Sequence, residues 1–216
     1  MSMTYNSLVS QITSYLNTTN AETIAQIPNF IYLTHNEICR KFVNLGYEQY
    51  VNGTFIANAI NGGSVLPKPS RWRANISFSY GSSPALISPS SIFIPLRTYE
   101  YCRTYNPDPS VSGAPQFYSD YGYQNWLVVP TPNLAYPFQI AYLEMPVPIN
   151  VNLQTNWLTN YAPDALLWGS LCKAIPFLKD DERVPLWQAY YKDACDSLEA
   201  QDRRNYQDRI SKRMAD

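Results

Sequence analysis

The segment RWRANISFSY, Arg71 to Tyr80, carries the pattern that decides the fold. Its aromatic and apolar residues occupy every second position from Trp72 to Tyr80, with arginine, asparagine and serine between them. A repeat of two residues is typical of a β-strand that buries one face. The segment therefore predicts such a strand, and the patterns on either side of it indicate what the strand packs against.

The residues around this strand show the same short-strand pattern. We expect further strands at five places: 91–94, 97–103, 116–121, 125–129 and 137–144. The sequence Asn61-Gly62-Gly63-Ser64 is typical of a hairpin turn. Proline is frequent at the strand ends, which favours short antiparallel strands because proline cannot donate to a sheet ladder. The middle of the chain therefore predicts an antiparallel, β-sandwich-like domain.

Helical periodicity replaces this pattern towards the N-terminus. Thr4 is placed to cap a first helix, whose apolar face begins at the next residue. Thr19 and Glu22 have the spacing of a capping box for a second helix, and Gly46 is placed to end it. Pro28 falls within the second helix, where we expect it to kink the helix or to mark its first turn.

Helical periodicity also follows the β-rich segment. Pro163 and Asp164 suit the first turn of a helix. Five later residues step by three and four positions and so form one helix face: Val184, Trp187, Tyr191, Ala194 and Leu198. We expect Trp187 and Leu171 to be buried where helices from the two ends of the chain pack together.

Three adjacent carboxylates precede that helix face, in the segment FLKDDERVPLW, residues 177–187. Asp180, Asp181 and Glu182 beside a tryptophan are compatible with a metal site, a pair of catalytic acids or a helix start. Acids at the start of a helix complement the helix dipole and cap free N–H groups, and this one cause accounts for all three. We therefore interpret them as a helix start.

These patterns together predict an α+β fold. In this fold the N- and C-terminal helices form a helical bundle, and an antiparallel β-sandwich-like domain is inserted between them. We expect residues 1–46 to form the N-terminal helices, residues 47–150 the β domain and residues 151–200 the C-terminal helices. Residues 201–216 are expected to form a polar tail.

The composition limits the classes of partner. The chain has 216 residues and a formal net charge of −1, so it is long enough to bury a core and has no positive field for nucleic acid or anionic membranes. Its four cysteines, at positions 39, 102, 172 and 195, lack CxxC spacing and are expected to be free thiols of a reducing compartment. The N-terminus lacks a signal-peptide pattern, and no apolar run is long enough to span a membrane. We expect no membrane partner.

Catalytic and cofactor-binding signatures are missing from the sequence. The single histidine, His35, lies beside an apolar helix stripe and cannot supply a His-rich metal site, so we expect it in the core or at its boundary. The patterns GxSxG, HExxH, GxGxxG and Walker A do not occur. Asp120 and Glu144 could in principle flank a sugar as a glycosidase pair, but their spacing does not support it. We therefore expect no enzyme activity, no metal and no cofactor.

Aromatic and basic residues of the β-rich segment leave an alternative open. Six tyrosines crowd one stretch: Tyr99, Tyr101, Tyr105, Tyr118, Tyr121 and Tyr123. Stacked aromatics bind sugars and single-stranded nucleic acids, but tyrosine also suits half-buried sheets and subunit interfaces, which we prefer. Lys68, Arg71 and Arg73 surround Trp72, and we interpret them as an ordinary exposed face rather than a contact for DNA phosphates.

Three segments carry a resemblance to a known family. They are GAPQFYSDY (113–121), PTPNLAYPFQIAYLEMPVPI (130–149) and TNWLTNYAPDALLWGSLCKAIPFLKDDERVPLWQAYYKDA (155–194). With them the chain resembles the head-to-tail adaptor proteins of tailed bacteriophages, close to the tail tubular protein A type of short-tailed phages. The resemblance covers nearly the whole chain. Its residues are scaffold residues rather than a catalytic signature.

The resemblance implies a structural role in the virion. It implies a ring, usually of twelve subunits, that lies beneath the portal at the head–tail junction and extends the DNA channel. The implied partners are the portal protein, the downstream nozzle protein and other copies of the chain, after synthesis in the host cytoplasm. Genomic double-stranded DNA would pass through without specific binding, which a near-neutral chain suits. The alternative is a carbohydrate- or receptor-binding tail module that uses the Tyr-rich β surface.

The polar tail is the candidate site for portal binding. Its candidate residues are Arg203, Arg204, Tyr206, Arg209, Ile210, Lys212 and Arg213. Tyr206, Ile210 and Met214 are spaced four apart, a stripe too narrow to hold a helix in water by itself. We expect the segment to be mobile alone and to become helical on a partner. The resemblance makes the portal the candidate, with the arginines pairing with portal carboxylates; a frayed, solvated end is the alternative.

Overall fold

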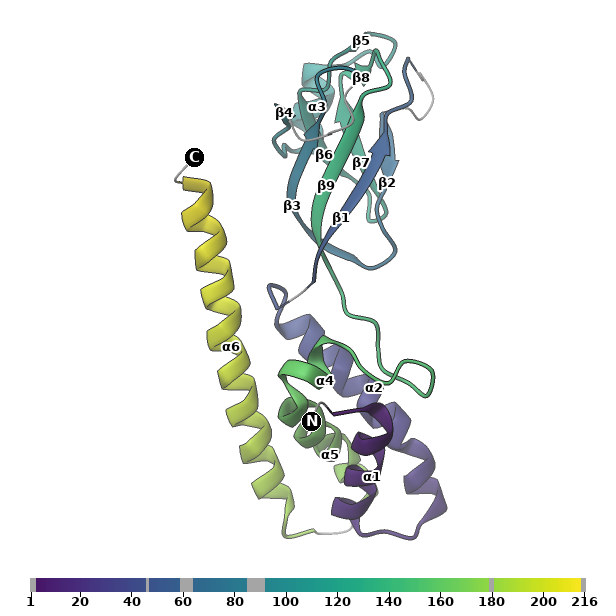
Figure 1. The fold of residues 1–216 in the computed structure, drawn as a ribbon, viewed down its shortest axis with the longest axis vertical. Helices are drawn as coiled ribbons and strands as arrows, with labels where there is room; N and C mark the ends of the chain where they lie inside the picture. Colours follow the sequence, from purple (N-terminus) through teal and green to yellow (C-terminus); the bar gives the residue numbers. More distant parts are fainter. Residues whose placement is uncertain (1–2, 46, 59–63, 85–91, 179–180, 215–216) are drawn as a thin grey trace. The chain divides into compact units, whose positions relative to one another are not determined.

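The computed structural model of the chain describes residues 3–45, 47–58, 64–84, 92–178 and 181–214 (Figure 1). It consists of helices and mainly antiparallel sheets, which confirms the α+β class. The chain divides into two compact units. Met1–Gly46 and Met145–Asp216 together form the helical unit, and Tyr47–Glu144 form the β unit. The second division therefore lies after Glu144 rather than at Asn150.

The N-terminal part of the helical unit is two helices, α1 (Tyr5–Leu16) and α2 (Ala21–Lys41). The cap of α1 is the expected one. The Thr4 hydroxyl accepts a hydrogen bond from the Ser7 N–H, and the Ser7 hydroxyl accepts one from the Thr4 N–H. Pro28 lies inside α2, as expected, rather than in its first turn.

Both ends of α2 differ from the sequence prediction. The N-cap is Asn20, whose side chain accepts a hydrogen bond from the Glu22 N–H, so the predicted capping box at Thr19 is wrong. Asn20 takes this role because its short side-chain carbonyl reaches the N–H two residues on. The helix ends before the predicted stop, Gly46, which lies outside the described residues.

The C-terminal part contributes four helical segments: α4 (Trp157–Tyr161), α5 (Pro163–Ala174), a 3₁₀ turn η1 (Ile175–Phe177) and α6 (Val184–Met214). Proline stands at the start of α5, as predicted, because the first helical residue needs no N–H partner. None of the described helices combines the length and apolarity that a membrane-spanning helix needs.

Helix α6 runs on past the boundary predicted at residue 200. It is one helix of 31 residues, so residues 201–214 continue it and are not a separate tail. Two physical reasons favour the continuation. Arginine, lysine and glutamine, which are common in this part, are good helix formers. The packed first half of α6 also supplies the nucleus that an isolated segment lacks.

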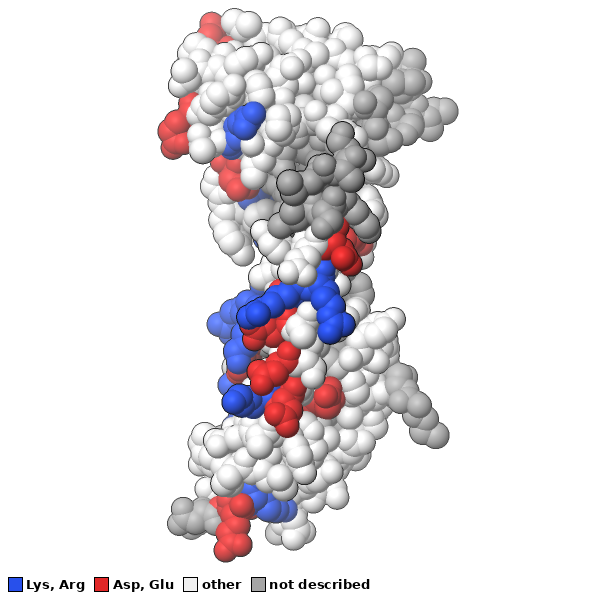
Figure 2. All heavy atoms as spheres, turned by 90° about the vertical axis from the view of Figure 1, so that its left-hand side faces the viewer, with Lys and Arg blue, Asp and Glu red and all other residues white. Residues whose placement is uncertain are grey.

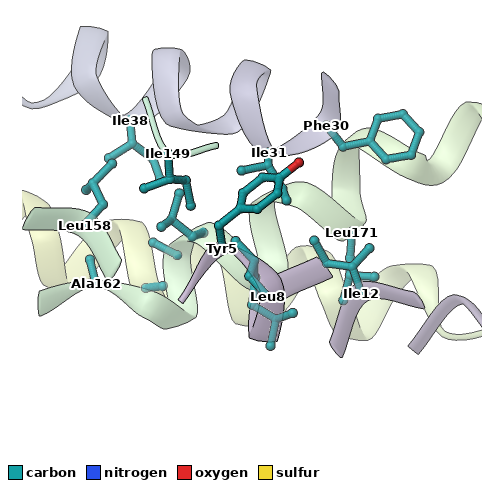
Figure 3. Packing of buried hydrophobic residues seen from close by; sticks show 14 of the residues in the cluster. Tyr5, Leu8, Ile12, Phe30, Ile31, Ile38, Ile149, Leu158, Ala162 and Leu171 are labelled. Carbon is teal, nitrogen blue, oxygen red and sulfur yellow. The ribbon is translucent and has the colours of Figure 1, made fainter. Parts of the chain in front are cut away.

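Helices from both ends of the chain share one apolar core. Figure 3 shows Tyr5 and Leu8 of α1, Ile31 of α2 and Leu171 of α5 converging in its interior. Leu171 and Trp187 are buried, as predicted, with Trp187 only 2% exposed. Burying such a side chain fully stabilises the fold by about 1.5–3 kcal/mol. This core fixes α6, the helix that carries the predicted partner-binding residues.

The β unit contains two principal sheets. The first is antiparallel and has the order β1 (Tyr47–Thr54), β9 (Pro137–Glu144), β3 (Trp72–Tyr80), β4 (Ile92–Phe93). The second, also antiparallel, has the order β2 (Val65–Pro67), β7 (Asn125–Val129), β6 (Phe117–Tyr121). A short parallel pair joins β5 (Ser112–Gly113) to β8 (Thr131–Pro132). The strand predicted from RWRANISFSY is therefore an inner strand of the first sheet.

The two sheets share one buried cluster. Phe78 of β3 and Ile140 of β9 meet Tyr118 of β6 and Trp126 of β7, and the last is fully buried. Phe78 lies edge-on to Tyr118, with ring centroids 5.1 Å apart. Because each sheet buries one face against the other, both leave a face or an edge that faces solvent.

One predicted strand is a helix. Residues 97–103 overlap α3 (Tyr99–Tyr105), which begins where the Thr98 hydroxyl accepts a hydrogen bond from the Tyr101 N–H. Tyrosine at alternate positions suggested a strand, but Tyr101 and Tyr105 both pack on Phe117 at helical spacing. The hairpin turn predicted at residues 61–64 lies outside the described residues except for its last position.

Candidate functional site

An arginine fixes the start of α6. Asp181 accepts hydrogen bonds from the backbone N–H of Arg183, at 2.9 Å, and from its guanidinium, at 2.7 Å. The Arg183 guanidinium also donates to the carbonyl oxygen of Tyr15, at the end of α1. Hydrogen bonding to Arg183 lowers the pKa of Asp181 to about 2. The carboxylate therefore fastens the approach to α6 onto α1.

The described part of the acidic run thus lies at a helix start, as predicted, and Asp181 has a further role there. Asp181 and Glu182 come directly before α6, and Asp180 lies outside the described residues. The predicted causes were the helix dipole and the capping of free N–H groups. Asp181 accepts a hydrogen bond from the backbone N–H of Arg183, and it also pairs with the guanidinium of that residue. Neither described acid is gathered with other ligands, since no group of three or more potential metal ligands occurs among the described residues.

The middle of α6 packs closely on α5 and α2 at Gly169. A Cβ atom at Gly169 would lie 2.4 Å from the Thr34 methyl carbon and 2.8 Å from a Tyr191 ring carbon. Only glycine fits this contact without a shift of its neighbours. The three helices therefore pack closely at this level.

Glu37 joins the same three helices by polar contacts. Its carboxylate pairs with Lys41 on α2 and Lys173 on α5, and accepts a hydrogen bond from the Tyr191 hydroxyl on α6 at 3.0 Å. Burial alone would raise the pKa of Glu37, but the hydrogen bonds from Lys173, Lys41 and Tyr191 outweigh it and bring the pKa to about 2. The carboxylate is therefore ionised and structural. Lys41 lies one helical turn from Glu37, but Lys173 and Tyr191 lie far away in the chain, so no sequence pattern indicates this cluster.

The last anchor of α6 is Asp202. One carboxylate oxygen accepts hydrogen bonds from the backbone N–H groups of Asn44, at 2.7 Å, and Leu45, at 3.0 Å. The other accepts one from the Asn44 side-chain amide, at 3.1 Å. Asp202 thereby holds the segment that follows α2. It marks the end of the part of α6 that is fixed to the helical unit by these polar contacts.

Beyond Asp202 the predicted partner-binding residues lie on one continuous helix. Arg203, Arg204 and Tyr206 are exposed, and Arg203 pairs with Glu199 one turn earlier. Tyr206 is 54% exposed, which is high for an aromatic side chain. Four further predicted residues are part of the same helix, but their side chains lie outside the described part: Arg209, Ile210, Lys212 and Arg213.

Charge is segregated along α6. Residues 184–202 contain four acids and one lysine, whereas residues 203–214 contain five basic residues and one acid. Figure 2 shows acidic and basic side chains gathered on the face of the helical unit that α6 forms. Basic residues in the last turns complement the negative end of the helix dipole. The part of α6 that follows Asp202 is therefore a positively charged helical segment.

A hollow of about 740 Å³ lies beside the middle of α6. Its walls include Phe42 after α2, Cys172 on α5 and Tyr191 and Cys195 on α6. Burial raises the pKa of both thiols and of Tyr191, so these groups stay protonated at neutral pH. A protonated thiol is a poor nucleophile and a poor metal ligand. Burial therefore gives neither thiol the activation that a nucleophile or a metal ligand needs.

The tyrosines of the β unit do not form one platform. Tyr118 is buried at 4% exposure, whereas Tyr121 and Tyr123 are exposed. Tyr99 and Tyr121 lie 5.9 Å apart, centroid to centroid, on the surface that α3 and β6 form. Only part of the predicted Tyr-rich surface is thus available to a ligand.

The predicted basic patch is not an exposed face at Lys68. Its side chain is 4% exposed, its ammonium is 2.6 Å from the Asp120 carboxylate, and it lies 3.7 Å above the Trp72 ring. A buried ammonium that stacks on tryptophan and pairs with an acid is satisfied within the unit. Arg71 lies 3.9 Å from Glu144. Asp120 and Glu144, the candidate acids for a glycosidase, each therefore face a basic residue.

His35 is fully buried, as predicted, with the Cys39 sulfur 3.9 Å from its ring nitrogens.

Comparison with known proteins gives one family. No match to the chain was found among curated proteins. A family model, described as SU10 adaptor protein, matches residues 3–213, which includes all of α6 except its last residue. The match therefore covers the helical unit, the β unit and nearly all of the predicted partner-binding segment. On this match the chain belongs to the SU10 adaptor protein family, the structural adaptors of bacteriophages.

Proposed function

We propose that this phage adaptor forms a ring of twelve copies in the mature virion, beneath the portal at the head–tail junction. The ring extends the DNA channel and joins the capsid to the downstream nozzle protein. The observation that carries the proposal is the family match over residues 3–213. The absence of a metal-ligand cluster among the described residues is compatible with a structural role.

The distal end of α6 is the portal-binding element in this proposal. It begins after Asp202, which fixes the preceding helix to the residues after α2. It carries five basic residues against one acid, together with the exposed ring of Tyr206. A helix that is anchored at one end presents its other end with less loss of conformational entropy than a disordered tail would. Portal carboxylates and an apolar groove are the complementary surface.

The DNA that passes through the ring makes no specific contact. The chain is close to neutral, and strong phosphate binding would hold DNA back. In the β unit, Lys68 is already paired with Asp120 and is not available to phosphates.

A truncation that ends at Asp202 tests the portal contact. It removes the basic end of α6 and leaves every anchor of the helical unit in place. The truncated chain is expected to fold and to fail to cosediment with portal-bearing capsids that lack the adaptor. Docking of the truncated chain at wild-type level would refute the assignment of the contact.

Two charge reversals on the same helix give the matched comparison. Arg204→Glu lies in the distal part and Lys192→Glu in the anchored part, and both positions are exposed. We expect Arg204→Glu to weaken docking on the capsid and Lys192→Glu to leave it unchanged. An exposed charge affects association only when it lies at or near the surface that meets the partner. Equal losses from both variants would indicate a nonspecific effect of net charge.

A carbohydrate- or receptor-binding role for the β surface is less well supported. Tyr118, at the centre of the predicted tyrosine cluster, is buried and belongs to the core of the β unit.

A further inference from the structure

The first sheet of the β unit ends in two very different edges. At one end, β4 has two residues and is followed closely by Pro95, features that blunt a sheet edge against further pairing. At the other end, β1 has eight residues in unbroken register with β9, from Tyr47 opposite Glu144 to Thr54 opposite Pro137. Within the described part of the chain, β1 pairs only with β9. The β1 edge is therefore long and regular, and no described strand lies beside it from Tyr50 to Thr54.

The hydrogen-bonding groups on this edge can be assigned from one bond. The Phe55 N–H donates to the Tyr136 carbonyl, across the continuation of the β1–β9 ladder. Backbone groups of an antiparallel strand point alternately to its two sides, so Gly53 and Val51 also face β9. The N–H and C=O groups of Tyr50, Asn52 and Thr54 then point away from β9, to the open side.

An apolar hollow lies along this edge. Its volume is about 340 Å³, and its walls include Val51 of β1, Leu66 and Pro67 of β2, and Phe138 and Ile140 of β9. It lies where the edges of the two sheets, β1 and β2, do not pair with each other. A strand added to β1 would place every second side chain on the Val51 face, which is the side of this hollow.

We propose that the β1 edge is a strand-addition site for an extended segment of another virion protein. The segment runs antiparallel to β1, bonds to the backbone of Tyr50, Asn52 and Thr54, and inserts apolar side chains at alternate positions into the hollow. The N–H and C=O groups of β1 that point away from β9 can pair in register only with an extended backbone. The hollow favours a segment that has apolar side chains at every second residue. The β1 edge and the hollow together thus specify the chemistry of the occupant.

The sheet edges of a second copy do not meet this specification. On the side of the hollow, the middle of β1 carries one apolar side chain, Val51, between Gln49 and Gly53, so this part of β1 of another copy would fill the hollow poorly. The other edge, β4, is blunted by its length and by Pro95. The occupant is therefore a segment of a different protein.

A peptide with the sequence of β9, PFQIAYLE, is a suitable probe because β9 already matches β1 in register. Its phenylalanine and isoleucine correspond to the residues that face the core beside Gly53 and Val51. The full-length chain is expected to bind the labelled peptide by fluorescence anisotropy. A peptide in which serine replaces the phenylalanine and isoleucine is expected to bind at least about tenfold more weakly. Equal binding of both peptides would exclude the hollow as the specificity site.

Tyr50→Pro and Tyr50→Ala separate the backbone from the side chain. Tyr50 is 59% exposed, and proline is tolerated on an edge strand where the lost N–H faces solvent. Tyr50→Pro is expected to abolish binding of PFQIAYLE, and Tyr50→Ala to retain it, with both variants unfolding like the wild type. Undiminished binding by a folded Tyr50→Pro chain would overturn the proposal.

Amide hydrogen exchange gives a test that needs no variant. With saturating PFQIAYLE, exchange at Tyr50, Asn52 and Thr54 is expected to slow by at least about tenfold, while Val51 and Gly53, already bonded to β9, change little. Uniform or absent protection along β1 would refute strand addition. Self-association of the wild-type chain that Tyr50→Pro abolishes would identify a second copy as the occupant and would also refute the proposal.

Discussion

Asp202 and Asn44 are joined by two hydrogen bonds, although 158 positions separate them in the chain. The contact ties the last helix to the residues that follow α2. It also divides α6 into an anchored, acidic part and a distal, basic part. The boundary between the anchored and the distal part of α6 depends on the side chain of Asp202, so a single substitution can test it.

Replacement of Asp202 by alanine is expected to destabilise the chain. The Asn44 and Leu45 N–H groups would lose an ionised acceptor, at a cost of about 1–3 kcal/mol. Urea unfolding measures the change. Asp208→Ala, an exposed acid on the same helix, is the control and is expected to change the free energy of unfolding by less than about 0.5 kcal/mol. Equal effects of the two substitutions would contradict the anchoring role.

Gly169→Ala tests the close approach of α2, α5 and α6. In a helix with free space, this substitution stabilises by about 1 kcal/mol. Here the new methyl group would meet the Thr34 methyl carbon and the Tyr191 ring, so we expect a loss of about 1–3 kcal/mol. Adding Thr34→Ser removes one of the two clashing groups and is expected to recover part of the loss. A stabilised Gly169→Ala chain would show that the helices are not in contact at this level.

Glu37 makes stability depend on pH in the acid range. Its pKa in the folded chain is about 2, below its ordinary value of 4.5. A lowered pKa stabilises the fold fully above pH 4.5, and this stabilisation is lost as the pH falls from 4.5 towards 2. Wild type is therefore expected to be more stable than Glu37→Gln at neutral pH. The difference in their free energies of unfolding is expected to shrink as the pH falls from 4.5 towards 2. A difference that is constant with pH would show that Glu37 is not ionised through these contacts.

The oligomeric state of the isolated chain is a further prediction. We expect the purified protein to be monomeric or weakly associated and to form rings only on the portal, because rings formed early would compete with ordered assembly. Multi-angle light scattering of the purified chain measures this directly. Stable rings in the absence of portal would contradict the expected order of assembly.

Sequence patterns correctly predicted the features that depend on residues close together in the chain. The steps of three and four from Val184 to Leu198 predicted the buried face of α6, and Trp187 and Leu198 are buried on it. Alternation predicted the strand β3, although its burial does not alternate: residues 72–77 are half-buried and residues 78–80 are all buried. The Thr4 cap was readable because the bonds of a capping box join residues three apart.

Contacts between distant residues could not be predicted in the same way. Glu37 contacts Lys173 and Tyr191, and Asp202 contacts Asn44. These partners lie far away in the chain, and no spacing along it relates them. The burial of Lys68 depends on Trp72 and Asp120 meeting around it in the folded sheets. The strand prediction for residues 97–103 was wrong because tyrosine is compatible with both a strand and the surface of α3. The Thr98 N-cap favours the helix.

Electron cryo-microscopy of whole virions tests the central claim most directly. The claim is that this chain is a structural adaptor between capsid and tail. The predicted result is density for a ring of copies of the chain directly beneath the portal, with residues 203–214 of each α6 against the portal and DNA passing through the ring. Density for the chain at the tail tip or in fibres, with none at the head–tail junction, would contradict the account.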